Sequence, residues 1–133
     1  MTYPQTENKD CQILVAEDNR VSKNLAVTML KKSGFHKVTA VSNGEEIFDH
    51  IAGTSFDIVL MDCQMPLLDG YESTRIIKKN FDRNGIIVIA VTSDNSPESL
   101  KRCKAVGMDG IIEKPFTVAK LERALEERWD MVV

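Results

Sequence analysis

Short apolar runs alternate with longer amphipathic segments between residues 11 and 130. The apolar runs are rich in β-branched residues, which is typical of buried strands, and the segments between them repeat their apolar positions at helical spacing. Strict alternation of the two kinds of segment predicts βα units and a parallel sheet. The predicted strands are residues 11–16, 37–41, 58–61, 86–91 and 110–113.

Capping residues indicate where the first helix begins and ends. Asn19 can cap its N-terminus, and Gly34 offers the left-handed conformation that commonly stops a helix. Val21, Leu25 and Met29 recur at helical spacing within it and predict its apolar stripe.

Two further helix starts are visible in the sequence. Ser42 and Glu45 have the spacing of a capping box, and Ser96-Pro97-Glu98 combines a cap, a first-turn proline and an acidic first turn. The last helix is expected to pack through one apolar stripe: Val118, Leu121, Leu125 and Trp129.

If the crossovers are right-handed and helices cover both faces of the sheet, this pattern predicts a doubly wound α/β fold. We expect five parallel strands in the order 2-1-3-4-5, in one domain over residues 11–130 that follows a flexible lead-in of residues 1–10. Ligands of such sheets bind at the carboxyl ends of the strands, so the candidate chemistry is expected there.

Composition excludes several functional classes. The chain has 133 residues, enough for one domain, and its net charge of −3 gives no basic footprint for nucleic acid. No apolar run reaches the length of a membrane span, and the first ten residues lack the layout of a signal peptide. We therefore expect a cytoplasmic domain without membrane contact, standing alone or as the cytoplasmic part of a membrane-bound protein.

The cysteines indicate a reducing compartment. Cys11, Cys63 and Cys103 are odd in number, far apart, and form no C-x-x-C pair, so neither a disulfide framework nor a zinc site is predicted. Cys11 and Cys103 are expected to be buried as small apolar residues.

Polar residues with matching chemistry follow four of the five predicted strands. Three carboxylates at neighbouring strand ends would repel one another, and a divalent oxygen-seeking cation such as Mg²⁺ removes that repulsion. A lysine and a threonine hydroxyl suit a phosphate group. The residues are Glu17 and Asp18 after the first strand, Asp62 after the third, Thr92 after the fourth and Lys114 after the fifth.

No glycine-rich nucleotide loop is present to hold a phosphoryl group, because neither G-x-x-x-x-G-K-[ST] nor G-x-G-x-x-G occurs. The economical hypothesis is that Asp62 attacks phosphorus and carries the group as an acyl phosphate. Glu17 and Asp18 would then hold the metal ion, and Lys114 would neutralise charge during in-line transfer.

These motifs resemble the receiver domain of two-component signalling, the phosphoacceptor module of response regulators and hybrid histidine kinases. The matching stretches are ILVAEDN (13–19), VLMDCQMPLLDG (59–70), IIVIAVTS (86–93) and GIIEKPF (110–116). The sequence motifs EDN and MDCQMP are most similar to those of receivers attached to hybrid kinases. The resemblance implies a flavodoxin-like (βα)5 fold and a phosphoprotein that assists its own phosphorylation and dephosphorylation without being an enzyme.

The resemblance also implies a role for each site residue. Asp62 matches the phosphoacceptor, Asp18 the direct Mg²⁺ ligand, and Glu17 a neighbour that acts through water. The backbone carbonyl of Gln64 matches a third protein ligand, and Thr92 matches the hydroxyl that moves to the phosphoryl group. Lys114 matches the lysine that forms an ion pair with the phosphoryl group. The peptide bond between this lysine and the next residue, here Pro115, is cis in the family. Pro66 and Asp69-Gly70 are interpreted as loop-shaping residues.

Partners are implied in the same way. A histidine kinase, a histidine phosphotransfer protein, or both would supply or accept the phosphoryl group. His36 and His50 lie away from the predicted strand ends and are interpreted as ordinary, partly exposed histidines, so the phosphodonor histidine is expected to belong to a partner. By family analogy, such a partner would dock around the site and the first helix, near Arg20, Val21 and Asn24.

One departure from the family pattern concerns the switch. Receivers commonly carry Tyr or Phe three residues before the lysine, and here that position is Ile111. Two alternatives stay open: a pseudo-receiver that binds without being phosphorylated, and a haloacid-dehalogenase-like phosphatase that also forms an aspartyl phosphate. The phosphatase would want a second acid two residues after Asp62, where this chain has Gln64.

Overall fold

A computed structural model describes residues 9–65, 69–81 and 85–127, and within them five parallel strands form one sheet. The strand order is β2-β1-β3-β4-β5, so the sequence-based prediction of the order is confirmed. The predicted lead-in and the end of the domain at residue 130 lie largely outside the described residues and stay predictions. The strands are β1 (Ile13–Ala16), β2 (Val38–Val41), β3 (Ile58–Asp62), β4 (Ile87–Thr92) and β5 (Gly110–Glu113).

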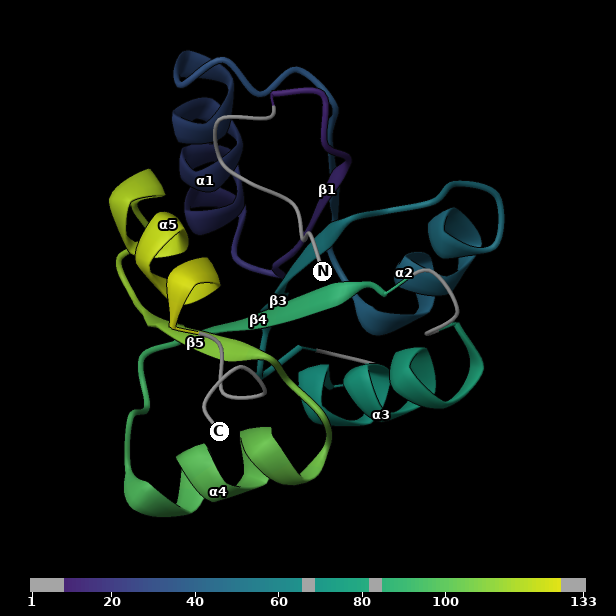
Figure 1. Ribbon diagram of the computed structural model, residues 1–133, viewed down its shortest axis with the longest axis vertical. Helices are drawn as coiled ribbons and strands as arrows, with labels where there is room; N and C mark the ends of the chain where they lie inside the picture. The colour runs from purple at the N-terminus through teal and green to yellow at the C-terminus, as the bar shows by residue number, and fades with distance from the viewer. Residues whose placement is uncertain (1–8, 66–68, 82–84, 128–133) are drawn as a thin grey trace.

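Helices cover both faces of this sheet, as predicted for a doubly wound fold. In Figure 1, α1 and α5 lie together on one side of the sheet, and α2, α3 and α4 lie on the other. The helices are α1 (Arg20–Lys32), α2 (Gly44–Ile51), α3 (Gly70–Asn80), α4 (Pro97–Ala105) and α5 (Val118–Glu126). The sequence pattern therefore predicted the type and order of every described element.

Each central strand contributes side chains to two separate apolar layers. Ile13 and Val15 pack in the layer that holds Leu30 of α1 and Leu121 of α5. The alternate strand residues pack in the other layer, together with residues of α2, α3 and α4. Because a strand buried on both faces has no polar side, its sequence is a continuous apolar run. This arrangement leaves the strand ends as the positions where polar side chains can gather.

The helix starts are confirmed in two places and corrected in one. The side chain of Asn19 accepts a hydrogen bond from the backbone N–H of Ser22, and Ser96 caps α4 with Pro97 in its first turn. The capping box predicted for Ser42 and Glu45 is wrong by one residue. Asn43 is the cap of α2, and it exchanges hydrogen bonds with Glu46. Asparagine has the short acceptor that a helix N-terminus needs, as serine does.

The predicted inner face of α1 is wrong for Val21 and Leu25 and confirmed for Met29, which packs against the layer of α1 and α5. Ala26 and Leu30 are its buried residues, whereas Val21 is 77% exposed and Leu25 43% exposed. A small alanine at the contact allows a helix to lie close to its sheet, and an apolar pattern gives alanine little weight. The helix is therefore rotated relative to the prediction, and two apolar side chains remain on its outer surface.

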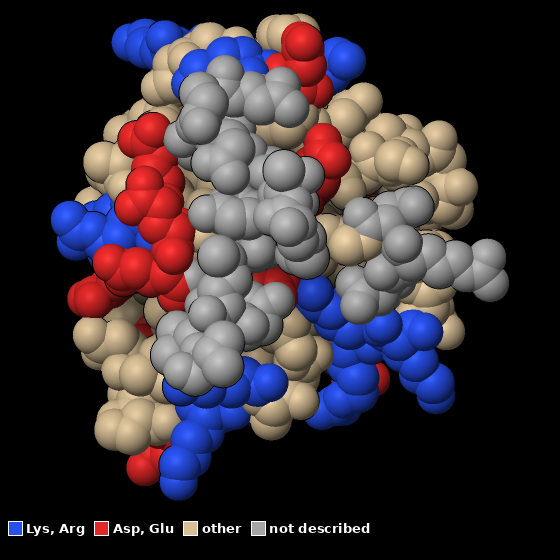
Figure 2. All heavy atoms as spheres, viewed as in Figure 1, with Lys and Arg blue, Asp and Glu red and all other residues tan. Residues whose placement is uncertain are grey.

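Charged side chains gather in groups on the face of the molecule that Figure 2 shows. Lys and Arg side chains lie over α3 and α4 in its lower part, and Asp and Glu side chains lie at its left edge near α5, with Lys or Arg side chains beside them. No helix in the described part of the chain is long and apolar enough to cross a membrane. Pro66 and Trp129, which the sequence assigned to loop shaping and to the stripe of the last helix, lie outside the described residues.

Candidate functional site

The register of the sheet brings the predicted site residues to one edge. Ala16 of β1 pairs with Met61 of β3, so the residues that follow them, Glu17 and Asp62, come side by side. On the other side of β3, Asp62 pairs with Val91, the residue before Thr92. The carboxyl ends of β1, β3 and β4 therefore deliver these side chains to a common point.

Three carboxylates form a cluster at this edge. Oxygen atoms of Glu17, Asp18 and Asp62 all lie within 4.8 Å of one another. Glu17 and Asp62 are buried, whereas Asp18 is exposed. The backbone N–H of Asn19 donates to the Glu17 carboxylate over 3.0 Å and fixes its direction. Because Asn19 ends this segment by capping α1, the acidic pair stays in the loop before the helix.

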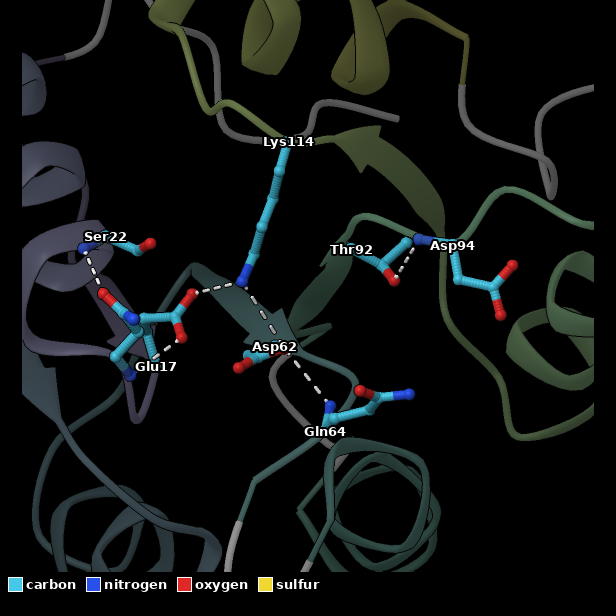
Figure 3. A network of polar contacts seen from close by, with 8 residues as sticks. Glu17, Ser22, Asp62, Gln64, Thr92, Asp94 and Lys114 are labelled. Carbon is cyan, nitrogen blue, oxygen red and sulfur yellow. Dashed lines mark hydrogen bonds and ion pairs between the residues drawn. The ribbon is translucent and has the colours of Figure 1, made fainter.

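Lys114 connects the two buried acids of the cluster. Figure 3 shows its side chain reaching from the end of β5, with its ammonium group between Glu17 and Asp62. The Nζ atom is 2.8 Å from Oε1 of Glu17 and 3.8 Å from Oδ1 of Asp62. Burial alone would lower the pKa of Lys114, but the neighbouring carboxylates raise it, Glu17 most strongly. The peptide bond from Lys114 to Pro115 is cis, as the family resemblance implied.

Asp62 lies in an environment that opposes its negative charge. Burial raises the pKa of its carboxyl group to about 8, and the adjacent Glu17 carboxylate adds to the rise. Two groups act in the opposite direction: the backbone N–H of Gln64, which donates to Oδ1 of Asp62 over 3.2 Å, and the Lys114 ammonium. The carboxylate therefore gains from an additional positive charge beside it.

Thr92 is buried at the end of β4, and its hydroxyl group already has a partner. The backbone N–H of Asp94 donates to Oγ1 of Thr92 over 3.0 Å, as drawn in Figure 3. The backbone N–H of Lys114 donates to the carbonyl of the same threonine, which ties the ends of β4 and β5 together. The hydroxyl group is thus directed toward the start of α4 in this state.

The sequence-based prediction did not identify the structural roles of two residues near the site, Asp69 and Gly70. Asp69 caps α3 by accepting from the backbone N–H of Glu72, so it is more than a turn residue. A side chain on Gly70 would clash with the backbone carbonyl of Asp62, which means that glycine allows α3 to approach the candidate phosphoacceptor. The signal available was a glycine in the first turn of a helix, where other residues are more favourable.

The remaining candidates take the positions that the sequence suggested. The three cysteines are buried free thiols. Both histidines are exposed, and His36 lies 3.1 Å from Asp10, in contact with a residue outside the site. Ile111 is partly buried and packs against the apolar layer of α2, α3 and α4.

The chemistry of the cluster matches a small divalent cation. Carboxylate oxygens are the ligands that Mg²⁺ selects, and a buried aspartate with a raised pKa is stabilised as an anion by such a charge. The ammonium group of Lys114, 3.8 Å from Oδ1 of Asp62, supplies positive charge for an anionic group beside that carboxylate. The site can therefore hold a cation and a phosphoryl group next to a carboxylate nucleophile.

Comparison with known proteins supports this reading. A family model described as the response regulator receiver domain matches residues 13–126. Histidine kinase 5 of Arabidopsis thaliana is 33% identical, over 92% of this chain and 16% of its own length. Hybrid signal transduction histidine kinase A of Dictyostelium discoideum is 35% identical, over 84% of this chain and 5% of its own length. The chain thus spans a small part of these relatives.

A solved structure extends the likeness to three dimensions. The receiver domain of the sensor histidine kinase PA1611 from Pseudomonas aeruginosa PAO1 has a TM-score of 0.78 and 33% sequence identity. The match covers 88% of this chain and 95% of that chain, which has a magnesium ion coordinated in its active-site cleft.

Proposed function

The chain belongs to the response regulator receiver domains and is like those of hybrid histidine kinases in two-component phosphorelays, and on this premise we propose that Asp62 is its phosphoacceptor. The observation that carries the proposal is the position of the Asp62 carboxylate. It lies buried at the end of β3, beside Glu17 and 3.8 Å from the Lys114 ammonium.

The proposed reaction is the transfer of a phosphoryl group from a phosphohistidine. A carboxylate oxygen of Asp62 attacks phosphorus, the phosphorus–nitrogen bond breaks, and the histidine nitrogen of the donor leaves and is protonated. Asp62 then carries an acyl phosphate. Lys114, which already lies between the two buried acids, balances the negative charge that gathers on the phosphoryl oxygens. In this way the domain assists its own phosphorylation and, with water as the acceptor, its own dephosphorylation.

Glu17, Asp18, Asp62 and the backbone carbonyl of Gln64 are the groups that would hold Mg²⁺. Bound there, the ion supplies positive charge to the transferring phosphoryl oxygens and lowers the repulsion among the carboxylates. Asp18 is the exposed member and can bind directly, and Glu17 is held by Asn19 and Lys114. This division agrees with a direct role for Asp18 and a role through water for Glu17.

Thr92 provides the link from phosphorylation to conformation. Its hydroxyl is within the same strand-end cluster but is bonded to the backbone of Asp94. In that bond the hydroxyl oxygen is the acceptor, and a phosphoryl group on Asp62 offers a charged acceptor to which the hydroxyl can donate its proton. We propose that Thr92 rotates to it, and that the state with the hydroxyl on the phosphoryl group is the active member of a two-state equilibrium.

The proposed partner is a histidine kinase or a histidine phosphotransfer protein that docks beside α1. Val21 and Leu25 are exposed apolar residues on this helix, flanked by exposed Arg20 and Asn24. A cavity of about 340 Å³ begins next to them and is lined by residues of α1, Pro115 and Phe116, as well as by Glu17 and Lys114. A partner seated there would present its histidine to Asp62.

The alternatives are not favoured. A haloacid-dehalogenase-like phosphatase needs an acid two residues after its nucleophile, and position 64 is an exposed glutamine. A pseudo-receiver, which is not phosphorylated, does not require three clustered carboxylates together with a lysine directed at them.

Chemical phosphorylation tests the proposal directly. The protein is incubated with acetyl phosphate and Mg²⁺, and its intact mass is measured. We expect the mass of one phosphoryl group to be added, in a form stable to acid and labile to alkali, and lost in Asp62→Asn and after chelation of Mg²⁺. A folded protein that gains no phosphoryl group, or that gains it equally in Asp62→Asn, would refute the proposal.

A further inference from the structure

Asp94 ties the hydroxyl of Thr92 to the first turn of α4. Its backbone N–H donates to Oγ1 of Thr92. Its side chain accepts from the backbone N–H of Ser96 over 3.0 Å and from the hydroxyl of Ser99 over 2.6 Å. One residue therefore joins the end of β4 to two positions at the start of the helix, and a rotation of Thr92 removes one of its three bonds.

Arg102 of α4 contacts two residues at the start of α3. Its guanidinium group lies 3.9 Å from the centroid of the Tyr71 ring, and one of its nitrogens is 3.8 Å from Oδ2 of Asp69. Asp69 caps α3, and Gly70 packs on the backbone of Asp62. The contact of Arg102 thus reaches, through the first turn of α3, the loop that follows Asp62.

Tyr71 is where the two connections meet. Its side chain is buried, and Cys63 and Ser99 are among the groups close enough to its phenol to influence the pKa of that phenol. A cavity of about 580 Å³ separates the Asp62 loop from α4, and Gln64, Tyr71, Ser99 and Arg102 are in its wall. The cavity gives α4 room to move against the loop without the cost of repacking a filled core.

The residue at the usual switch position does not make this link. Ile111 lies on β5, where it pairs with Ala90 of β4, and packs as an aliphatic side chain against the apolar layer. The aromatic ring that contacts α4 near the site comes from α3 instead. A cation–π contact between an arginine and a tyrosine ring can bias two states of similar energy.

We propose that Tyr71 and Arg102, together with the Thr92–Asp94–Ser99 chain, couple phosphorylation of Asp62 to the position of α4. The inference rests on the proposed function. When the Thr92 hydroxyl turns to the phosphoryl group, Asp94 loses that acceptor, the first turn of α4 is released, and Arg102 changes its place on the Tyr71 ring. Tyr71, Asp94, Ser99 and Arg102 are positioning residues: of the residues in this link, only Thr92 touches the phosphoryl group.

The test compares the amide NMR spectra of the full chain before and after addition of beryllium fluoride and Mg²⁺, a stable mimic of the phosphoryl group. Arg102→Ala is compared with Lys101→Ala, an exposed neighbour on the same helix, and with Ile111→Val. Acetyl phosphate adducts are measured in parallel by intact mass. We expect the shifts of residues 97–105 to fall at least twofold in Arg102→Ala, with adduct yield unchanged, and to persist in both other variants.

Two further variants separate the parts of the link. Tyr71→Phe keeps the ring and should retain most of the response, whereas Ser99→Ala should weaken it. Undiminished α4 shifts in Arg102→Ala at normal adduct yield would overturn the inference and leave the proposed function standing. Loss of the response in Ile111→Val with retention in Arg102→Ala would assign the coupling to β5 and also overturn it. Absence of any adduct in the unsubstituted protein would instead overturn the proposed function.

Discussion

Gly70 at the start of α3 lies directly against the backbone carbonyl of Asp62, so closely that a methyl group on its Cα would clash with that oxygen and lie 2.9 Å from the Cα of Cys63. Its own N–H donates to the carbonyl of Cys63 over 3.2 Å. The helix and the loop are therefore held at a distance that only glycine permits. This contact fixes the backbone that carries the proposed phosphoacceptor.

Gly70→Ala is expected to destabilise the protein by about 1–3 kcal/mol, the range for forcing an extra carbon into a packed position. The clash is with backbone atoms, which cannot move aside as a flexible side chain can. Urea unfolding followed by circular dichroism measures the change. Gly53→Ala is the matched control, because nothing lies within 4 Å of its Cβ position. Equal unfolding midpoints for the two variants would contradict the prediction.

Asp62→Asn is expected to stabilise the metal-free protein. Burial and Glu17 raise the pKa of Asp62 to about 8 from its ordinary value of 3.8, so the folded state binds this proton more tightly than the unfolded chain. The free energy of unfolding of the unsubstituted protein should therefore decrease as pH rises from about 4 to about 8. Asparagine has no charge to develop, and at pH 8 the variant should be more stable by on the order of 1–3 kcal/mol.

The measurement is urea unfolding in EDTA at several pH values. The difference between Asp62→Asn and the unsubstituted protein should be small near pH 4, widen up to about pH 8 and then stay constant. Asp49→Asn, an exposed substitution on α2, controls for loss of one negative charge. A gap that is independent of pH would show that the Asp62 charge is not what destabilises the folded protein.

Much of this site could be predicted because single residues at strand ends carry it. The alternation of apolar runs with helical segments located each strand end to within one residue, since β3 and β4 end at Asp62 and Thr92 rather than at the predicted residues 61 and 91. The parallel register then places Glu17 beside Asp62. No knowledge of side-chain packing was needed for that step. The chemistry of the cluster followed from residue types alone, since carboxylates, lysine and threonine have few other reasons to share one edge.

What could not be predicted depends on how the helices are rotated and on contacts between them. Val21 was expected on the inner face of α1, but the small Ala26 occupies the contact and leaves Val21 outside. The stacking of Arg102 on Tyr71 joins residues of two helices whose spacing in the sequence gives no signal. Such contacts are set by the packing distance between elements, which a periodic pattern does not encode.

Asp18→Asn is expected to weaken Mg²⁺ binding by roughly tenfold or more, because it removes the exposed charged oxygen of the cluster. Isothermal titration calorimetry with MgCl₂ gives the dissociation constant. Glu45→Gln removes an exposed acid from α2 and should leave the constant unchanged. The same loss of affinity in both variants would mean that overall charge, rather than this cluster, binds the ion.

Lys114→Ala is expected to slow phosphorylation by acetyl phosphate by roughly tenfold or more. The ammonium group lies 2.8 Å from Glu17 and 3.8 Å from Asp62, and without it two buried carboxylates repel both each other and the incoming phosphoryl group. Adduct formation is followed by intact mass over time at fixed Mg²⁺. Lys79→Ala, an exposed lysine at the end of α3, is the control. If both variants react at the rate of the unsubstituted protein, Lys114 has no part in the transfer.

Thr92→Ala and Thr92→Ser are expected to separate phosphorylation from its consequence. Thr92 is not among the groups assigned to the metal or to charge balance, so both variants should form the adduct to within about threefold of the normal yield. The hydroxyl is what the phosphoryl group would attract away from the Asp94 N–H, over the 3.0 Å contact seen here. Alanine should therefore reduce the amide shifts of α4 on addition of beryllium fluoride by at least twofold, whereas serine, which keeps the hydroxyl, should preserve most of them. Equal α4 shifts in the alanine variant and the unsubstituted protein would remove Thr92 from the switch.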